Sequence, residues 1–595
     1  MKMDNVGGGD NKLPVLCSPD VLAGRIKIST VFACLYLEQP ALNSYLSKFI
    51  KSIIIPLQSP VNTNTTTMAN PSATPSSIHE GMERLDIKSI TDPSATPFSY
   101  LVTAFLLAVV VYSLQGPRFP KNIKHLNPKG PLEFSDTRPK KEFVYGSRQM
   151  LANWFKANPN KPCRVISDFG EAIVLPPRMA NEIKNDDRLS FTRWTYKAFH
   201  GHLPGFEGFG EASRESHIVQ EVIMRDLTKY LNKVTEPLAQ ETSMAMEANL
   251  PKAANGEWST INLRSRILPI VARISSRVFL GEELCRNEEW LKVTQQYTID
   301  GFGAAEDLRL WPAALRPIAH WFLPSCQRAR ADVRVARSIL DPVLKKRRQE
   351  KAANGGKAEH DDAIEWFERT AKGKYYDPAV AQLVLSLVAI HTTSDLTCQV
   401  MTNLMQNPEI IAPLREEMVQ VLSEGGWKKT SLYNMKLLDS AIKESQRLKP
   451  TGVASMRRYA EKDVTLSDGT FIPKGGFVAV SAHDMWNSEV YEQAEKWDGR
   501  RFLRMRETPG AGKENVAQLV STAPEHLGFG HGQHACPGRF FAANEIKIAL
   551  VHLLLNYEWR LPEGSDPKIR TFGFSMGVDP SLKVEYKGRQ PEIEL

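Results

Sequence analysis

One loop, FGHGQHACPGR from Phe529 to Arg539, constrains this sequence more than any other stretch. Pro537 lacks the N–H group that would be unpaired in the first turn of a helix, so we expect Cys536 at a helix N-terminus. Free N–H groups and the helix dipole at that end favour a thiolate. The loop also contains Gly530, Gly532 and Gly538, which let its backbone approach a flat, bulky group closely. We therefore predict an anionic sulfur that faces a large planar partner.

Two other interpretations of Cys536 need to be weighed. A lone cysteine in a glycine-rich turn is by default a buried, inert residue. Alternatively, His526, His531 and His534 join Cys536 as ligands of a zinc ion. Structural zinc sites usually take two short ligand pairs separated by a longer loop, and no second pair follows here. The spacing therefore argues against zinc.

Composition limits the classes of partner. Of the 595 residues, 42% are hydrophobic and 9% aromatic, which is ample for a large core. The net charge of +8 is not concentrated in a dense basic block, and no nucleic-acid motif is present, so we expect no nucleic acid partner. An acidic protein or a membrane surface suits this charge better. The seven cysteines are scattered and form no paired framework, which indicates a reducing compartment for the catalytic part.

Residues 1–97 differ in composition from the rest of the chain. They include the tract NTNTTTMANPSATPSS, from Asn62 to Ser77, and we expect an N-terminal extension that is mostly disordered. The apolar runs within it are too short to span a bilayer. Met68 and Met82 are alternative starts of translation, in which case the first part is an artefact of the gene model.

Residues 98–114, FSYLVTAFLLAVVVYSL, contain no charged side chain. At about 1.5 Å per residue this run spans roughly 25 Å, close to the roughly 27 Å core of the endoplasmic reticulum membrane. We predict a single transmembrane anchor; a buried core helix is the alternative. Basic residues follow the run, whereas mixed charges precede it, so the positive-inside rule places the C-terminal bulk in the cytosol. Residues 115–131, with four prolines, form a semi-rigid hinge.

Residues 132–595 have a mainly helical pattern with a few short strands. Asp377 suits an N-cap and Pro378 a first helical turn, and we predict a helix of roughly thirty residues from there to Asn407-Pro408. This helix is too polar to be a second membrane span. The segment VTLSDGTFI predicts a hairpin that turns at Asp468-Gly469.

The first loop has Phe, Gly three positions later, Cys four positions after that and Gly two positions further on, a spacing that resembles the haem-binding loop of the cytochrome P450 family. The resemblance implies a haem b cofactor whose iron takes the Cys536 thiolate as axial ligand, which favours O–O cleavage. Phe529, Gly532 and Gly538 would contact this cofactor. Many relatives have arginine where this chain has His534, near a haem propionate, and histidine would be a weaker and pH-dependent donor. The implied architecture is a mainly α fold with small β-sheets, the cytochrome P450 fold, over residues 132–595.

A second element resembles the ExxR segment of the same family. Glu444 and Arg447 lie three residues apart on one helical face, an arrangement that by itself is most often a surface ion pair of small value. In the family this pair is buried and locks the loop behind the haem. Arg501, in the segment GRRF, would be its third partner.

The resemblance also implies cations near the haem propionates. Arg458 is our candidate, with Arg457 as the alternative, because guanidinium pairs well with carboxylate. The family usually also places a Trp and an Arg four residues apart on an early helix for this purpose. We find no such pair here, and His217 or Arg225 is expected to replace it.

The long predicted helix resembles the oxygen-binding helix of the family. By position, Ala389 is its small residue and Thr393 the threonine that helps to protonate bound oxygen. The fit is partial, since Ile390 stands for the usual glycine and Thr392 for the usual acid. Asp395 lies about 200° around the helix from Thr393 and cannot simply replace that acid. Proton delivery through Thr392, Ser394 or ordered water is therefore open.

The segments LRLWPAALRPIAHW, HLPGFEGF, IHTTSDL and HACPGRFFA resemble fungal secondary-metabolism members, similar to ent-kaurene oxidase and dihydromonacolin L monooxygenase. This implies a membrane-anchored monooxygenase that oxidises a small apolar molecule, a terpenoid or polyketide, with O2 and NADPH-derived electrons. The electrons would come from NADPH cytochrome P450 reductase, an acidic flavoprotein that docks on a basic face around Arg539 and Lys547. By position alone, the substrate pocket includes Phe206, Ala389, Ile390, Val453, Ala454, Phe574 and Met576. Because the usual acid is missing at Thr392, the alternative is a haem-thiolate enzyme that isomerises, reduces or cleaves without monooxygenation.

Overall fold

The computed structural model describes Ala104 and residues 116–133, 135–250, 256–357, 359–508 and 513–595. Residues 87–595 form one compact unit, and the other unit, residues 1–86, lies outside the described residues. The predicted extension, and the anchor at 98–114 except Ala104, likewise lie outside the described residues. The hinge is described from residue 116 onward.

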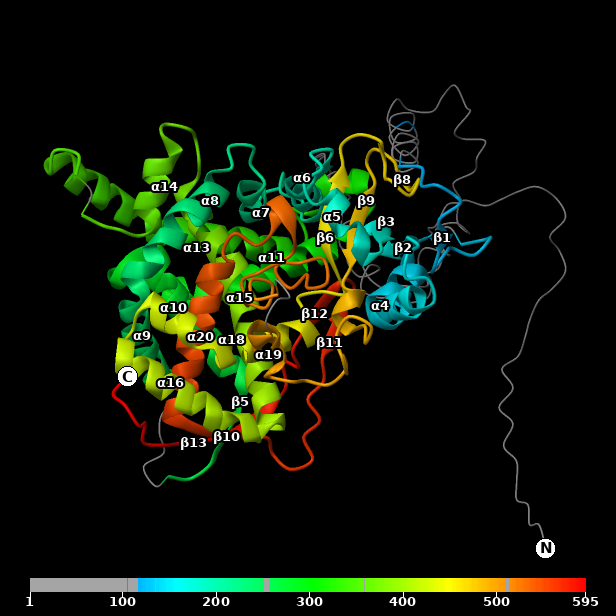
Figure 1. Cartoon of the computed structure of the whole chain (residues 1–595). Coiled ribbons are helices and arrows are strands. Elements are labelled where there is room, and N and C mark those ends of the chain that lie inside the picture. The colour runs from blue at the N-terminus through cyan, green and yellow to red at the C-terminus, as the bar shows by residue number, and fades with distance from the viewer. Residues whose placement is uncertain (1–103, 105–115, 134, 251–255, 358, 509–512) are drawn as a thin grey trace, which may run out of the picture. The chain divides into compact units, whose positions relative to one another are not determined.

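Helices dominate the described part of the chain, as the sequence pattern predicts (Figure 1). They are α4 (Thr137–Ala157), α5 (Ala180–Ile183), α6 (Phe191–Ala198), α7 (Glu207–Ala212), α8 (Ile218–Glu221), α9 (Thr228–Asn249), α10 (Leu263–Leu284), α11 (Glu288–Arg309), α12 (Arg316–Ala319), α13 (Pro324–Ala353), α14 (Ala363–Ala371), α15 (Pro378–Gln406), α16 (Ile411–Gly425), α17 (Lys429–Asn434), α18 (Lys436–Leu448), α19 (Arg501–Glu507) and α20 (Arg539–Asn556).

The strands form small sheets. A six-stranded sheet has the order β1-β2-β3-β9-β6-β4, a three-stranded sheet the order β10-β13-β5, and β11-β12 and β7-β8 are hairpins. Their bounds are β1 (Lys124–His125), β2 (Cys163–Ser167), β3 (Gly170–Leu175), β4 (Leu189–Ser190), β5 (Ser259–Asn262), β6 (Ala454–Ala460), β7 (Val464–Thr465), β8 (Phe471–Ile472), β9 (Phe477–Ser481), β10 (Tyr557–Arg560), β11 (Arg570–Phe572), β12 (Ser575–Gly577) and β13 (Lys583–Gly588). Figure 1 shows the six-stranded sheet and α4 on one side of the molecule and most of the helices on the other.

The predicted hairpin is present. Val464 pairs with Ile472 and Thr465 with Phe471 in antiparallel register. Gly469 has a φ of 81°, in the left-handed region that glycine adopts without a steric penalty. The turn chemistry of Asp468-Gly469 therefore sets this register.

Helix α15 is the central element of the helical half. The Asp377 side chain accepts a hydrogen bond from the N–H of Val380 at 3.1 Å, and Pro378 occupies the first turn, which confirms the predicted start. The helix ends at Gln406, before Pro408. Among the described residues it alone is long and apolar enough to cross a membrane, yet 72% of its most apolar window is buried inside the fold. It is a core helix, as its polar residues predict.

The main apolar core is formed by α9, α10, α15, α16, α18 and α20. Helix α20, which follows the Cys536 loop, runs through this core, and its segment Ile546–Leu555 is almost entirely buried. Loop, core and α15 are therefore held in one packed unit.

Candidate functional site

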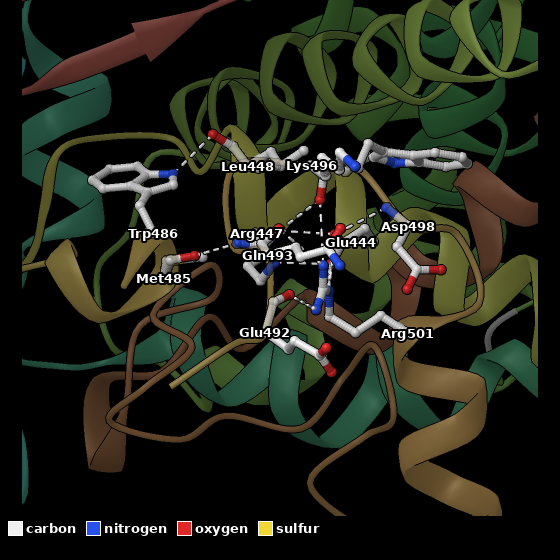
Figure 2. Close-up of polar contacts among 12 residues, drawn as sticks. Glu444, Arg447, Leu448, Met485, Trp486, Glu492, Gln493, Lys496, Asp498 and Arg501 are labelled. Carbon is white, nitrogen blue, oxygen red and sulfur yellow. Dashed lines mark hydrogen bonds and ion pairs between the residues drawn. The ribbon is translucent and has the colours of Figure 1, made fainter. Parts of the chain in front are cut away.

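A buried cluster of charged residues joins α18 to the start of α19. Glu444 and Arg447 are both 0% exposed, and the guanidinium donates two hydrogen bonds to the carboxylate, from Nε to Oε2 and from Nη2 to Oε1, each at 2.8 Å. Arg501 donates from Nε to both carboxylate oxygens at 3.1 Å (Figure 2). The three side chains thus lie together, in the buried arrangement that the resemblance implies.

This cluster also fixes the loop between β9 and α19. Arg447 donates to the carbonyl of Met485, and Arg501 donates to the carbonyl of Glu492 at 2.6 Å. Both guanidinium groups reach the carbonyl of Lys496 (Figure 2). Because Glu444 is the shared carboxylate, its loss would leave two cations with carbonyl partners alone.

The Cys536 loop folds back on itself. The N–H of Cys536 donates to the carbonyl of Phe529 at 2.8 Å. Gly532 has a φ of 79°, and a Cβ at this position would overlap the side chain of Lys184. Helix α20 begins at Arg539 with Gly538 as its N-cap, so Pro537 precedes the helix and does not occupy its first turn as predicted. Cys536 therefore lies three residues before the helix, on its N-terminal side.

Burial decides the ionisation of Cys536 in the protein alone. It raises the pKa of the thiol, whereas the N–H groups of Gly538 and Arg539 and the charge of Arg539 lower this pKa by less. The N–H groups at the helix end lower this pKa as expected, but in the protein alone desolvation outweighs them. A metal ion that binds the sulfur would deprotonate it directly.

The zinc alternative fails on geometry. Among the residues that the structure describes, no three His, Cys, Asp or Glu side chains come together as a metal site. His526 is buried, with its ring 5.7 Å from that of Phe502, whereas His531 bonds Asn181 at 3.0 Å. These histidines serve separate packing and hydrogen-bonding roles.

Arg458 on β6 is a buried cation without an acidic partner. It is 2% exposed, donates from Nη1 to the carbonyl of Arg457 at 2.9 Å, and its Nε has no hydrogen-bond partner. No carboxylate of the described residues pairs with it. Burial lowers its pKa to about 10, so it still carries its charge at neutral pH. An unpaired buried cation of this kind fits an anionic ligand.

His534 lies within electrostatic range of both Arg458 and His217. Burial, followed by the charges of Arg458 and His217, lowers the pKa of His534 to about 4, so His534 is neutral at physiological pH. His217 has a φ of 51°, a left-handed conformation that side chains other than glycine rarely adopt. Such strain is often found at functional sites. These three side chains form what we call the cationic pocket.

The other two arginines that the sequence suggested as propionate contacts, Arg225 and Arg457, have other partners. Arg225 donates to Glu221 at 2.9 Å and to Thr370 at 2.8 Å and so is not part of the pocket. Arg457 lies between the rings of Trp194 and Phe574, 5.4 Å from each. Adjacent residues of a strand point to opposite faces of the sheet, so the two neighbouring arginines of β6 have different surroundings.

Two adjacent threonines of α15 lie in different surroundings. Thr392 is exposed, as is Val388 one turn earlier, and its hydroxyl donates to the carbonyl of Val388 at 2.7 Å. Thr393 is 3% exposed and lies against Glu545 of α20. Of the two threonines, Thr392 is therefore on the exposed face of the helix. The family resemblance had instead assigned Thr393 as the hydroxyl that helps to protonate bound oxygen.

The acids and bases around these threonines are already engaged. His391 hydrogen-bonds the carbonyl of Gln295 at 3.1 Å, and burial lowers its pKa, so it is neutral. Asp395 pairs with Lys449 and accepts from the N–H of Val578 at 2.9 Å. Neither side chain replaces the missing acid by direct contact with Thr393.

The expected basic face around Arg539 and Lys547 is wrong for Lys547, which is buried, whereas Arg539 is partly exposed. Lys547 is 4% exposed and pairs with Asp439 at 2.7 Å. Arg539 donates to the carbonyls of Val520 and Cys536. Both cations therefore stabilise the fold, and sequence position alone did not reveal that α20 is covered on this side.

The apolar residues expected around a substrate divide into groups. Val453, Ala454, Phe574 and Met576 pack in one cluster with Phe143. Phe206 belongs to a different cluster, Ile390 is fully buried, and Ala389 packs on the main core. Only the members of the first group pack together in one cluster.

The residues present fit a haem. Cys536 is partly exposed at the end of a loop opened by glycines, and the cationic pocket offers an unpaired guanidinium for a propionate.

Sequence reasoning missed Glu545, a fully buried acid of α20. In the sequence, Glu545 is the one carboxylate in the run FAANEIKIALVHLLL, residues 541–555.

Comparisons with known proteins agree with this geometry. The family model described as Cytochrome P450 matches residues 178–586. The cytochrome P450 monooxygenase hepE of Aspergillus oryzae is 49% identical over 510 residues, which cover 84% of this chain and 92% of the relative. The cytochrome P450 monooxygenase TRI1 of Fusarium sporotrichioides is 46% identical, over 85% of this chain and 93% of the relative. The dihydro-ML-236C monooxygenase mlcC of Penicillium citrinum is 39% identical, over 84% and 96%.

Proposed function

The chain belongs to the cytochrome P450 family and is a haem-thiolate monooxygenase, and from that premise we propose that it oxidises a small apolar molecule of fungal secondary metabolism at a membrane surface. The observation that carries the proposal is that the structure contains both a candidate haem ligand, Cys536, and a candidate propionate-binding cation, Arg458. Cys536 lies at the end of a closed glycine-containing loop, and the buried Arg458 lies in charge range of His534 and has no carboxylate partner in the part of the chain that the structure describes. A thiolate ligand and a propionate-binding cation are what a haem requires.

The chain's own residues would hold this cofactor as follows. Cys536 binds the iron, Phe529 covers the sulfur, and Gly532 and Gly538 keep the loop backbone close to the ring. Arg458 pairs with a propionate, and His217 and the neutral His534 add hydrogen bonds. When bound, the haem supplies the chemistry that inserts one atom of O2 into a C–H bond and releases the other as water.

Protons for that reaction would pass the exposed face of α15. The Thr392 hydroxyl donates to a backbone carbonyl, which leaves its lone pairs free to accept a hydrogen bond from water. We therefore assign Thr392, and not Thr393, as the hydroxyl that moves protons on the oxygen side. The missing acid would be replaced by ordered water, because His391 and Asp395 already have partners.

The substrate is proposed to be an apolar terpenoid or polyketide. The cluster of Val453, Ala454, Phe574 and Met576 offers an apolar wall, and the name of the Penicillium citrinum relative supports a specific small organic substrate. Electrons would come from NADPH through a flavoprotein reductase. The surface on which the reductase docks does not include Lys547, which is buried.

Membrane attachment at the endoplasmic reticulum is proposed from the apolar run 98–114. A second observation supports it: Leu310, Ile318, Trp321 and Phe322, between α11 and α13, are each more than 40% exposed. Such a group of large apolar side chains suits a lipid surface.

The decisive experiment is an absorption spectrum of the reduced, carbon-monoxide-treated protein, followed by a panel of terpenoids and polyketides screened for spectral binding shifts. A thiolate-ligated spectrum and a shift with an apolar ligand are expected. Turnover with isotopically labelled oxygen should then label the product. Product that carries no label would favour the alternative reaction, isomerisation, reduction or cleavage without oxygen insertion.

A further inference from the structure

Glu545 is a buried acid that the proposed function does not use. It lies on α20, is 0% exposed, and its Oε1 accepts a hydrogen bond from the hydroxyl of Ser275 on α10 at 2.6 Å. No lysine, arginine or histidine among the described residues forms an ion pair with it. Its other oxygen, Oε2, has no hydrogen-bond partner assigned among the described residues.

Such a carboxyl is far more stable as a neutral acid than as an ion. An isolated buried carboxylate would lose its hydration without gaining a cation in return. Burial raises the pKa of Glu545 to about 8. The hydroxyls of Ser275 and Thr393 lower this pKa, but by less than burial raises it. A neutral acid carries an O–H group, which in turn needs an acceptor.

Thr393 offers that acceptor. On α15, the hydroxyls of Thr392, Ser394 and Thr397 each donate to the carbonyl one turn back. The Thr393 hydroxyl makes no such bond, and it lies close enough to the Glu545 carboxyl to affect its pKa. The Thr393 hydroxyl is therefore the neighbour best placed to meet the Glu545 oxygen that Ser275 does not bind.

We propose that Glu545 keeps its proton in the folded enzyme and donates it as a hydrogen bond to Thr393 Oγ1, so that Ser275, Glu545 and Thr393 form one neutral chain joining α10, α20 and α15. No proton is transferred in this arrangement. The acid O–H donates to Thr393 Oγ1, and the O–H of Thr393 can donate a hydrogen bond to another acceptor. Glu545 is thus a positioning residue for the turn that carries Thr392. Only the positioning of the Thr392 turn rests on the proposed function; the protonation of Glu545 does not.

The test is an infrared spectrum of the haem-loaded full chain, because the carbonyl stretch of a protonated carboxyl is separate from that of a carboxylate. With isotopically labelled glutamate, we expect a protonated-acid band at neutral pH that is lost in Glu545→Gln. This band should shift in Thr393→Val, which removes its acceptor, and in Ser275→Ala, which removes its donor. Thr392→Val is the matched control and should leave the band in place.

The outcomes separate this inference from the proposed function, because the spectrum requires no turnover. A labelled spectrum without the band, or a band unmoved by Thr393→Val, overturns the proposal. Should Glu545→Gln fail to fold, the shifts in Thr393→Val and Ser275→Ala decide it in the same way. Loss of activity in Thr392→Val with the band intact would support both the function and the separate role of Thr393.

Discussion

A carboxylate removed from water needs a compensating partner, and two glutamates of this chain meet that need differently. Glu444 lies between Arg447 and Arg501, which place two guanidinium groups within 3.1 Å of its carboxyl oxygens. Glu545 has only hydroxyl neighbours and is held neutral. The residue type is the same, but the partners around the two carboxyl groups differ.

Replacing Glu444 by Gln should destabilise the fold by about 3–5 kcal/mol, because two buried guanidinium groups lose their shared carboxylate. The measurement is the free energy of unfolding in denaturant, together with haem retention. Glu142→Gln is the control, since Glu142 pairs with Arg138 on the surface with 44% and 52% of the side chains exposed, and we expect a change of about 0–1 kcal/mol. Equal, small effects in both variants would show that the buried cluster contributes little.

Replacing Cys536 by Ala should abolish the thiolate-ligated spectrum, because no other residue of the loop provides an anionic sulfur. Cys326→Ala, at a buried cysteine of α13, should retain it. The two carbon-monoxide spectra make the comparison. A thiolate-type spectrum in Cys536→Ala would contradict the assignment of the axial ligand.

At the scale of single elements, α15 shows how one helix serves two environments. Adjacent residues are about 100° apart around a helix, so Thr392 and Thr393 cannot face the same side. Thr392 shares the exposed face with Val388, and Thr393 faces the interior toward α20. The two hydroxyls should therefore respond differently to substitution.

Thr392→Val should raise the fraction of NADPH electrons released as peroxide, because the variant removes the hydroxyl on the open face at nearly constant shape. Thr393→Val should chiefly lower stability, by about 1–3 kcal/mol, since it leaves the Glu545 acid without an acceptor. NADPH consumption, peroxide, product and unfolding are measured for both. Uncoupling confined to Thr393→Val would return the oxygen-side role to that residue.

The α10–α20–α15 contact also predicts a pH dependence. The folded state holds the Glu545 proton up to a pKa of about 8, whereas the unfolded state releases it near 4.5. Unfolding therefore releases a proton between these values, and the stabilisation is complete below pH 4.5 and lost as the pH rises through about 8. Relative to Glu545→Gln, wild type should lose up to roughly 5 kcal/mol across this window. Parallel stability curves for the two proteins would rule out a shifted Glu545.

At the scale of the whole molecule, we expect the catalytic unit to fold and bind haem independently of the apolar run 98–114. The cationic pocket, the Cys536 loop and the buried charge cluster all lie after residue 200. None of them draws on the residues before the hinge. The haem site should therefore form without the N-terminal part.

Deleting residues 1–115 should release the protein from membranes and leave the thiolate-ligated spectrum unchanged. Flotation with vesicles measures the first effect. Residual binding should fall further when Trp321 and Phe322, both more than half exposed, are replaced by Ser. Undiminished binding of the truncated form with those replacements would reject the anchor.

The sequence by itself determined the features that depend on local order. The spacing around Cys536, the three-residue step from Glu444 to Arg447, the Asp377 cap of α15 and the Asp468-Gly469 hairpin are written in neighbouring residues, and each was predictable for that reason. Recognition of the family followed from the first two.

Only the tertiary structure decided which side chains lose water and which charges meet. Lys547 and Arg539 are basic in the sequence, yet Asp439 and backbone carbonyls from other segments bind them. Arg458 differs from Arg457 in that aromatic rings hold Arg457, whereas Arg458 has no carboxylate partner in the described chain. Thr392, Thr393 and Glu545 gained their roles from the packing of α15 against α20. Burial and ion pairing depend on which distant elements touch, and no local pattern encodes that.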